Sequence, residues 1–397
     1  MSKSPLYSLQ RISEQSIVDE EYYWDLVREH FILSKKGIYL NNGSLGISPR
    51  IVVEAVIRDI VQNEIYFTET KEDYSNLKEI GAEFLGADPE EIVITRNTTE
   101  GMNMVAQGLV LKKGDEILTS DHEHVGGKAC WEVREARDGI RIKRVHLPFQ
   151  PADENEILNI INDGIAKKTK VISISHILFT NGAVMPVKEI CKLARDKKIL
   201  SVIDGAHPPG MIKINLKEIG CDFYASSFHK WLLAPKGTGL LYIRKEINHL
   251  LYPVIASGGW NDLKLLSDRF TVGTINESLL VGLKKAFEFQ NTIGKERIEL
   301  RIKQLNRYLR GKLFEIPGLK IHSPMNNSLS AGIVSFKIDG IPAAEIAKKL
   351  WKNQKIVVRI VSEYDYDLTR VSTHIYNSFS DIDRFIESLK LIVERKI

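Results

Sequence analysis

The sequence has little cysteine. Its 397 residues include only three cysteines, Cys130, Cys191 and Cys221, which lie far apart and show no Cys-x-x-Cys spacing. Disulfide frameworks and structural metal sites use closely spaced sets of such residues, so we expect neither disulfides nor a bound metal. The pattern is typical of a protein that works in the reducing cytoplasm.

Long apolar runs and a surplus of one charge are also missing. No run reaches the about 18 residues of a membrane span, and the first residues, MSKSPLYSLQRISEQ, lack the apolar core of a secretory signal. The 55 basic and 51 acidic residues leave a formal net charge of only +4. We therefore expect neither a membrane nor a nucleic acid as a partner.

Glycine-rich nucleotide motifs are absent too. The chain contains neither G-x-G-x-x-G nor G-x-x-x-x-G-K-[ST], which weakens the alternative of a nucleotide-binding α/β protein. Hydrophobic residues make up 43% of the chain, which is ample for buried cores. A chain of this length is expected to form about two or three domains.

Between about 90 and 245, short apolar runs alternate with helical patterns. Such alternation predicts an α/β fold, with a mainly parallel seven-strand sheet flanked by helices. The expected strands are EIVIT, DEILTS, RIKRVHL, KVISIS, ILSVID, DFYASS and GLLYI.

The pattern changes on either side of this region. An amphipathic helix is expected at 16–34 and another at 50–66, opened by Pro49. After about 285, a charged helix at 293–315 leads to the strands AGIVSFKI, KIVVRIV and RVSTHIY and to helices at 343–353 and 380–394. We predict an N-terminal helical segment (1–36), a large domain (37–285) and a small C-terminal α+β domain (286–397).

Two side chains at predicted strand ends carry most of the chemical information. Asp204 ends LSVID, and Lys230 follows the run DFYASSFH. The carboxyl ends of such strands meet at a ligand-binding crevice. A lysine there can form a Schiff base, and a buried carboxylate can pair with a pyridinium nitrogen, which are the two groups that pyridoxal phosphate (PLP) most needs. The alternative is an ion pair between Asp204 and Lys230 without a cofactor.

Three polar segments follow other predicted strands. Thr98 and Thr99 precede a predicted helix, where they either bind a phosphate or only cap the helix. His124 is either a structural residue or a ring stacked on a cofactor, since no further metal ligands are nearby. His176 follows KVISIS, so it belongs either to a polar loop or to the ligand crevice.

Together these motifs resemble the class V aminotransferase family of fold-type I PLP enzymes, over about 37–393. The family includes cysteine desulfurases, selenocysteine lyases, kynureninase and isopenicillin N epimerase. The forms HKWLLAPKGTGLLY, SHILFTNGAVMPV and RVSTHIYN are most similar to the isopenicillin N epimerase-like branch. The resemblance implies the PLP-transferase fold, PLP as cofactor, an amino acid as substrate and a homodimer with shared active sites.

The resemblance also implies a role for each matching residue. Lys230 matches the Schiff-base lysine, and Asp204 matches the partner of the pyridine nitrogen. His124 matches the ring-stacking position, and His207 matches a residue on the ring-oxygen side. The remaining matches are the phosphate-binding Thr98, Thr99, Ser227 and His229, the turn Gly273–Thr274 that reaches the neighbouring subunit's phosphate, His176 near the substrate, and the carboxylate-binding Arg370.

Two departures from the sequence pattern of the family narrow the range of reactions that we expect. Family desulfurases carry a mobile cysteine in one of two regions, but SPMNNSLSAG and VVRIVSEYDYDL contain none, and Tyr364 lies in the second. Ile275-Asn276 follows the Gly-Thr turn, where epimerases commonly have Arg-Asp. We expect aminotransferase-type or epimerase-like chemistry through a Lys230 aldimine and a Cα carbanion. The alternatives are a Cβ–S/Se lyase without a persulfide cysteine and a non-catalytic PLP-binding relative.

Overall fold

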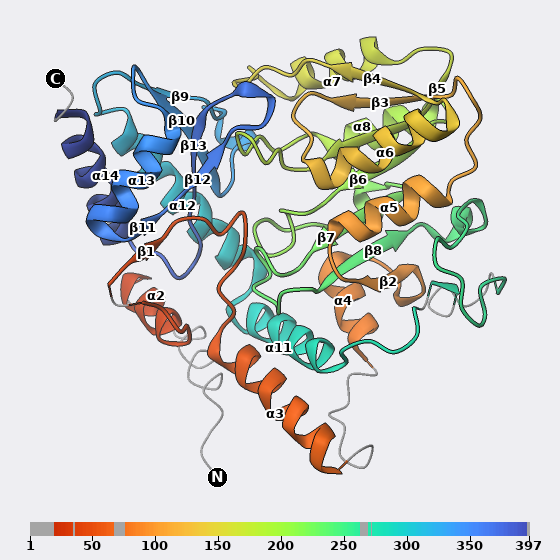
Figure 1. The fold of residues 1–397 in the computed structure, drawn as a ribbon, viewed down its shortest axis with the longest axis horizontal. Coiled ribbons are helices and arrows are strands. Elements are labelled where there is room, and N and C mark those ends of the chain that lie inside the picture. The colour runs from red at the N-terminus through yellow and green to blue at the C-terminus, as the bar shows by residue number, and fades with distance from the viewer. Residues whose placement is uncertain (1–19, 35, 67–75, 263–268, 271, 395–397) are drawn as a thin grey trace.

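A seven-strand sheet forms the centre of the larger unit (Figure 1). The structure, a computed structural model, describes residues 20–34, 36–66, 76–262, 269–270 and 272–394. The order of the strands is β2-β8-β7-β6-β5-β3-β4. The strands are β2 (Ile92–Thr95), β3 (Glu116–Ser120), β4 (Arg141–Val145), β5 (Thr169–Ser175), β6 (Leu200–Asp204), β7 (Phe223–Ser227) and β8 (Gly239–Ile243). The predicted seven-strand sheet is confirmed.

The sheet is mainly parallel, as predicted. The pairs β4–β3, β3–β5, β5–β6 and β6–β7 are parallel, whereas β8 runs antiparallel to both β7 and β2. The carboxyl ends of β5, β6 and β7 therefore lie along one edge. The loop that joins β7 to the antiparallel β8 starts from that edge, and it carries Lys230.

Helices cover both faces of this sheet because successive strand residues point to opposite sides. In β8, Leu240 and Tyr242 pack in one core cluster, and Leu241 and Ile243 pack in another. Helices α5 (Thr98–Gly108) and α6 (Val125–Asp138) cover the second of these faces. The first is covered by α4 (Leu77–Leu85), α7 (Glu154–Gly164), α8 (Val187–Asp196), α9 (Leu216–Ile219) and α11 (Ser278–Ile293).

The smaller unit is an antiparallel sheet with the strand order β12-β13-β10-β9, packed against helices. Its strands are β9 (Leu319–Ile321), β10 (Ile333–Ile338), β12 (Arg359–Val361) and β13 (Leu368–Ser372). Its helices are α12 (Lys295–Leu313), α13 (Ala343–Gln354) and α14 (Phe379–Glu394). Short 3₁₀ turns complete the fold: η1 (Pro89–Glu91), η2 (Lys245–Leu250), η3 (Asn327–Leu329) and η4 (Glu363–Asp365).

Two predicted strands differ from the structure. The run KIVVRIV, predicted as one strand, forms β11 (Ile356–Val357) and β12, because the chain changes its pairing partner between them. The run RVSTHIY leaves the sheet after Ser372. There the His374 backbone N–H donates to Asn377 Oδ1 at 2.9 Å, which turns the chain towards α14.

The N-terminal part of the chain reaches the smaller unit. Strand β1 (Ile38–Tyr39) pairs in parallel with β11, and Asn41 bridges to Ser372. Helix α3 (Arg50–Tyr66) matches its predicted range, and α2 (Glu20–Glu29) lies within the predicted 16–34, of which 16–19 fall outside the described residues. The boundaries at 36/37 and 285/286 stay predictions. Within the described residues, no helix is long and apolar enough to cross a membrane.

Candidate active site

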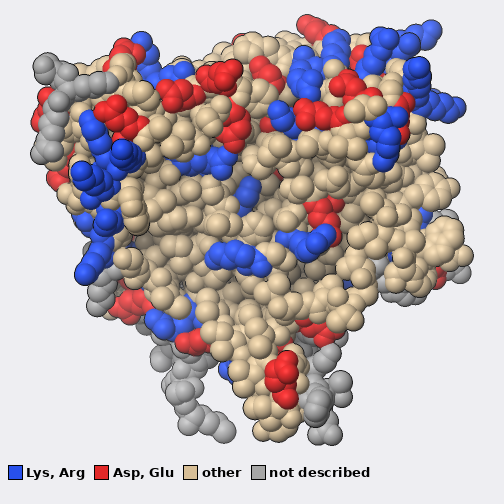
Figure 2. All heavy atoms as spheres, in the orientation of Figure 1, with Lys and Arg blue, Asp and Glu red and all other residues tan. Residues whose placement is uncertain are grey.

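One cavity of about 240 Å³ lies between the two units. The ends of β5, β6 and β7 form one wall, and β12 and β13 form the other. Figure 2 shows basic side chains in the middle of this face of the molecule, where the two units meet. The predicted site residues that line the cavity are Thr98, Thr99, His124, Asp204, His207, Ser227, His229, Lys230 and Arg370.

Lys230 is presented by a tightly held loop. Phe228 at the start of the loop is fully buried; its N–H donates to Thr238 O, and its carbonyl accepts from the Ala234 N–H. The buried Leu233 adopts a left-handed φ of 63°, a conformation that costs a non-glycine residue about 1 kcal/mol or more. Burial and these hydrogen bonds hold the loop in one conformation, so the position of Lys230 is fixed.

The amine of Lys230 and the carboxylate of Asp204 respond to the same buried surroundings. Burial lowers the pKa of Lys230 to about 8, against an opposing effect of Asp204. Burial also raises the pKa of Asp204, while the charge of Lys230 lowers it. Asp204 Oδ1 accepts from the Ala206 N–H at 3.0 Å. Within the described part of the chain, no ion pair joins Asp204 to any cation within 4.0 Å, so the carboxylate is left to pair with a group in the cavity.

Helix α6 brings a flat ring to the cavity. His124 caps the helix, and its Nδ1 accepts from the Gly126 N–H at 3.1 Å. The ring of Phe179 contacts the imidazole edge-on at 5.0 Å between centroids. Burial and the charge of Lys230 lower the pKa of His124 to about 4, so the ring is neutral at pH 7. A Cβ on Gly127 would come within 2.8 Å of Asp204 Oδ2, so the helix needs glycine for this close approach.

The start of α5 supplies uncharged donors at another side of the cavity. Asn97 caps the helix by accepting from the Glu100 N–H. The N–H and the hydroxyl of Thr98 both contact Ser227 Oγ, at 2.9 and 2.8 Å. His229 Nδ1 is buried and has no hydrogen-bond partner among the described residues. A helix N-terminus with neighbouring hydroxyls and an unpaired imidazole nitrogen is suited to an anion such as phosphate.

Two arginines form the opposite wall. Arg359 and Arg370 are directly paired residues of the antiparallel strands β12 and β13. The buried Arg370 guanidinium donates to Phe179 O at 2.9 Å and to Ser44 Oγ at 3.1 Å, both uncharged acceptors. Burial, followed by the charge of Arg359, lowers the pKa of Arg370 to about 9. Like charges placed opposite one another destabilise a sheet, so this wall is suited to binding an anion.

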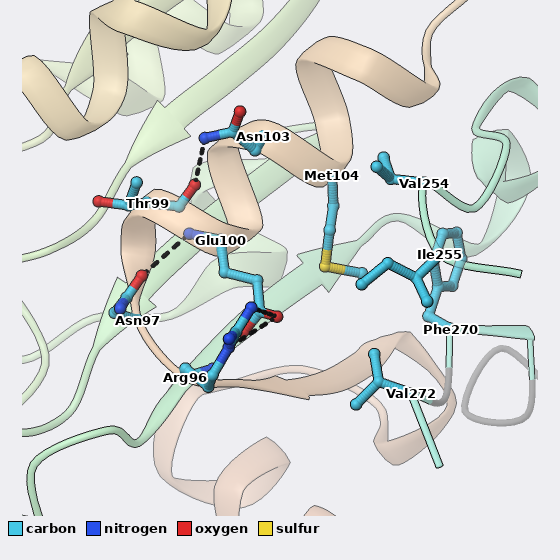
Figure 3. A pocket seen from close by; sticks show the side chains of 10 residues that line it. All are labelled: Arg96, Asn97, Thr99, Glu100, Asn103, Met104, Val254, Ile255, Phe270 and Val272. Carbon is cyan, nitrogen blue, oxygen red and sulfur yellow. Dashed lines mark hydrogen bonds and ion pairs between the residues drawn. The ribbon is translucent and has the colours of Figure 1, made fainter.

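His176 and Thr274 do not line this cavity. His176 follows Ser175 at the end of β5, and successive residues of a strand face opposite sides. Ser175 therefore lines the cavity, while the His176 imidazole contacts Tyr224 Oη at 2.8 Å. Thr274 is exposed. Its near neighbour Val272 lines a second cavity of about 520 Å³, shown in Figure 3, which shares Asn97 and Thr99 with the first.

Sequence reasoning missed Arg359 and Ser44, which also line the cavity. Arg359 Nη2 donates to Glu363 Oε1 at 2.5 Å, and its Nη1 lies 3.5 Å from Ser44 Oγ. The only signal in the sequence was the position of Arg359 in a predicted strand. Ser44 lies in the Gly/Asn-rich loop after β1, and the sequence does not show which end of the fold this loop approaches.

The three cysteines lie away from this chemistry. All are buried, and none lines the cavity. Burial raises the pKa of Cys130 and Cys191 to about 12 and that of Cys221 well above its ordinary value. Tyr364, in the region where desulfurases were expected to carry a cysteine, donates from its hydroxyl to Glu123 O at 2.7 Å. Because their raised pKa keeps the thiols of the three cysteines protonated, these thiols are poor nucleophiles.

The residues of the cavity fit PLP. A buried amine and a buried carboxylate provide for covalent attachment and for pairing with a pyridinium nitrogen. The neutral ring of His124 can stack on a flat heterocycle, and the donors at the start of α5 can hold a phosphate. The arginine wall remains for a substrate carboxylate. Among the described residues, no cluster of His, Cys, Asp and Glu could hold a metal ion.

Comparisons with known proteins agree with PLP as the cofactor. Residues 57–385 match the family model described as aminotransferase class-V. Isopenicillin N epimerase of Streptomyces clavuligerus is 30% identical over 92% of this chain and 97% of its own, and a probable cysteine desulfurase of Pyrococcus abyssi is 28% identical over 93% and 97%.

Solved structures show the same likeness. The apo structure of a cysteine desulfurase from Thermococcus onnurineus has a TM-score of 0.82 and 28% identity, covering 93% of this chain and 98% of that one. A C-DES mutant with glycine covalently linked to its PLP cofactor has a TM-score of 0.83 and 25% identity, covering 91% and 98%. The chain therefore belongs to the class V aminotransferase family, and it is a PLP-dependent enzyme.

Proposed function

We propose that this enzyme acts on an α-amino acid by moving the proton on Cα, in an aminotransferase-type or epimerase-like reaction. The observation that carries the proposal is that Lys230, Asp204 and Arg370 line one cavity. Arg370 binds the substrate carboxylate, and Lys230 would hold the cofactor and then move the Cα proton. When bound, PLP provides an electron sink, which the carboxylate of Asp204 maintains by holding a proton on the pyridine nitrogen.

The state of each residue supports its role. With a pKa near 8, Lys230 changes protonation close to neutral pH, as a group that both accepts and donates a proton must. Asp204 is 6% exposed, so its pairing with a cation is little weakened by water. Arg370 is 1% exposed and makes its hydrogen bonds to uncharged groups, which leaves its charge for the substrate.

A Cβ–S or Cβ–Se lyase is the second candidate. A solved structure with a TM-score of 0.81 and 25% identity is described as a complex between the cystine C-S lyase C-DES and its product cysteine persulfide. Elimination of this kind needs the same Cα deprotonation but no enzyme cysteine. The buried, protonated thiols of this chain therefore argue only against a desulfurase that forms its own persulfide.

The test is a panel of amino acids added to the enzyme loaded with PLP. We expect the cofactor absorbance to change with substrates, and a keto acid or an epimerised amino acid to form. Pyruvate with sulfide or selenide would instead establish the lyase. If no amino acid changed the absorbance, the proposed function would be wrong and the protein would be a non-catalytic relative.

We further propose a homodimer in which Gly273–Thr274 of each chain contributes to the phosphate site of the other. This turn is exposed, so its donors are available to a partner. Helix α3 projects from the body of the molecule (Figure 1) and exposes Ile57, Val61 and Ile65, spaced by four residues along one face. An exposed apolar stripe of this kind supports a protein interface. Cytoplasmic location also stays a prediction, supported by three free cysteines.

Mixing two inactive variants tests the shared site. A Lys230→Ala chain and a Thr274→Ala chain would form mixed dimers in which one site carries both changes and the other carries neither. Activity should reappear on mixing. If subunits exchange but activity does not return, Thr274 serves its own chain, which is possible because Val272 and Thr99 line the same second cavity (Figure 3).

A further inference from the structure

The residue after Lys230 contacts another residue of the cavity. Trp231 is fully buried, and its indole Nε1–H donates a hydrogen bond of 3.0 Å to Nδ1 of His207. An indole N–H can only donate. His207 Nδ1 must therefore be an acceptor without a proton, and the doubly protonated ring is excluded. The neutral imidazole carries its proton on Nε2.

The Nε2 atom of His207 is the part of the ring left for a ligand. His207 lines the cavity. Within the described residues, Nε2 has no hydrogen-bond partner. It is also not one of the fully buried unpaired polar atoms, so it remains accessible to a ligand. Burial, followed by the charges of Lys230 and Arg370, keeps the pKa of His207 well below its ordinary value. The ring therefore stays neutral and offers a donor to the cavity.

The indole cannot easily turn away from His207. A Cβ on Gly332 would come within 2.5 Å of Trp231 Cη2, so the far edge of the ring is already in close contact. The Trp231 carbonyl accepts from Gln290 Nε2 at 3.1 Å and from His374 Nε2 at 2.9 Å. The His374 ring stacks on the indole, with 5.5 Å between centroids and 29° between planes. Trp231 is therefore held along both its backbone and its ring.

We propose that Trp231 is a positioning residue that holds His207 in the Nε2–H tautomer, so that the imidazole donates a hydrogen bond to the ring oxygen of PLP. This inference rests on the cofactor site proposed above. A donor stabilises the anionic form of an oxygen and so lowers its pKa. Without Trp231, the imidazole can also adopt the Nδ1–H tautomer, which presents an acceptor to that oxygen.

The tautomer can be measured on the protein without cofactor, by NMR of ¹⁵N-labelled histidine. In the wild-type protein, His207 should show a protonated Nε2 and an unprotonated Nδ1. In Trp231→Phe, which keeps an aromatic ring but removes the donor, the two tautomers should mix. A proton on Nδ1 in the wild type would overturn the inference even if the variant did not fold. An unchanged tautomer in Trp231→Phe would overturn it as well.

The effect on the cofactor is a second readout. Trp231→Phe should raise the pKa of the PLP absorbance band by about 0.5 to 1 pH unit, the size expected for one lost hydrogen bond. In a His207→Gln background, where the amide supplies its own donor, the same change should cause no shift. An equal shift in both backgrounds would show a general structural effect and refute the positioning role.

Trp131→Phe is the matched control. Its indole is also fully buried, and it donates to Ser173 Oγ at 2.9 Å. This variant should lose stability without moving the absorbance pKa; a matching shift would count against a specific role for Trp231. A protein with no cofactor band would disprove the proposed cofactor site and the PLP contact inferred from it. The NMR experiment would then still decide the tautomer.

Discussion

The two walls of the cavity differ in charge and in how the chain builds them. The wall of the large sheet brings Asp204, Ser227 and Lys230 from the ends of consecutive parallel strands, and it carries charges of both signs. The wall of the small sheet brings Arg359 and Arg370 from directly opposed antiparallel positions, and it presents two cations. The first wall fits the cofactor, which needs a lysine, an acid and phosphate donors. The second fits the anionic part of a substrate.

The comparison shows that chemistry and recognition are built separately. The lysine and the acid come from short neighbouring segments of one sheet, Asp204 from the end of β6 and Lys230 from the loop after β7. The arginine wall depends on contacts between distant segments, such as Arg370 with Ser44. Changes in the large wall should therefore lower the catalytic rate, and changes in the small wall should mainly weaken substrate binding.

The largest effect is expected from Lys230→Ala. Loss of the attachment point and of the proton carrier should lower turnover by roughly 10³-fold or more. Borohydride reduction and peptide mapping of the wild type should find PLP on Lys230. Lys236→Ala is the matched control, because Lys236 lies in the same loop but bonds to Gly46 O at 2.9 Å. A label on any other lysine would contradict the assignment.

Asp204→Asn should come next. The neutral amide cannot hold the pyridinium proton, so we expect PLP to remain bound while kcat falls at least tenfold, which is about 1.4 kcal/mol in barrier height. Asp222 offers a control, since it is equally buried, at 6% exposure, but is bonded to Arg244. Asp222→Asn should lower the melting temperature and leave the cofactor band unchanged. A smaller loss of kcat in Asp204→Asn would disprove the role in the electron sink.

Arg370→Gln should raise KM more than it lowers kcat. Loss of a charge-assisted contact to a carboxylate is worth about 1.5–3 kcal/mol, or roughly 10- to 100-fold in KM. Arg359→Gln should have a smaller effect, because Glu363 already neutralises part of its charge. Steady-state kinetics with one amino acid would compare the two. A larger effect in Arg359→Gln would assign the substrate carboxylate to the other arginine.

Loading of PLP onto the apo-protein should depend on pH through Lys230. Only the neutral amine attacks an aldehyde, and the pKa of Lys230 is lowered from 10.5 to about 8. Below pH 8 the neutral fraction, and hence the loading rate, should rise about tenfold per pH unit, and above pH 8 it should level off. Asp204→Asn should move the plateau to lower pH, because the Asp204 charge raises the pKa of Lys230. A rate that kept rising to pH 10 would show an unperturbed lysine.

The smallest effect on turnover is expected from replacing Cys130, Cys191 and Cys221 with alanine. Since all three are buried away from the cavity, stability should fall while kcat stays within about twofold, or 0.4 kcal/mol. Persulfide found by mass spectrometry on any wild-type cysteine after reaction with cysteine would revive the desulfurase interpretation.

The sequence predicted the large wall better than the small one for a physical reason. Asp204 ends an apolar strand and Lys230 follows another, and parallel strands bring their carboxyl ends to one edge. Each position could therefore be placed from its local pattern. Ser175 and His176 show the limit of that argument, because only the phase of β5 decides which of the two neighbours faces the cavity.

The small wall depends on pairings that a local pattern does not reveal. Arg359 becomes a partner of Arg370 only because the chain leaves β1 and joins β13 after Val357. The hydrogen bond between Trp231 and His207 joins two loops at the same sheet edge, and its donor direction needs coordinates. The tautomer of His207 could not be inferred from its neighbours in the sequence.

The pairing of β1 with β11 also has a consequence for how the chain folds during synthesis. Strand β1 and the following Asn41 and Ser44 leave the ribosome early, yet their partners, β11 for the strand and β13 for the two residues, are made more than three hundred residues later. The large unit can assemble as it emerges, since domains generally fold in order of synthesis. The segment around β1 must wait without its partners until residue 372 is complete. Substrate binding should therefore be the last property that a newly made molecule gains.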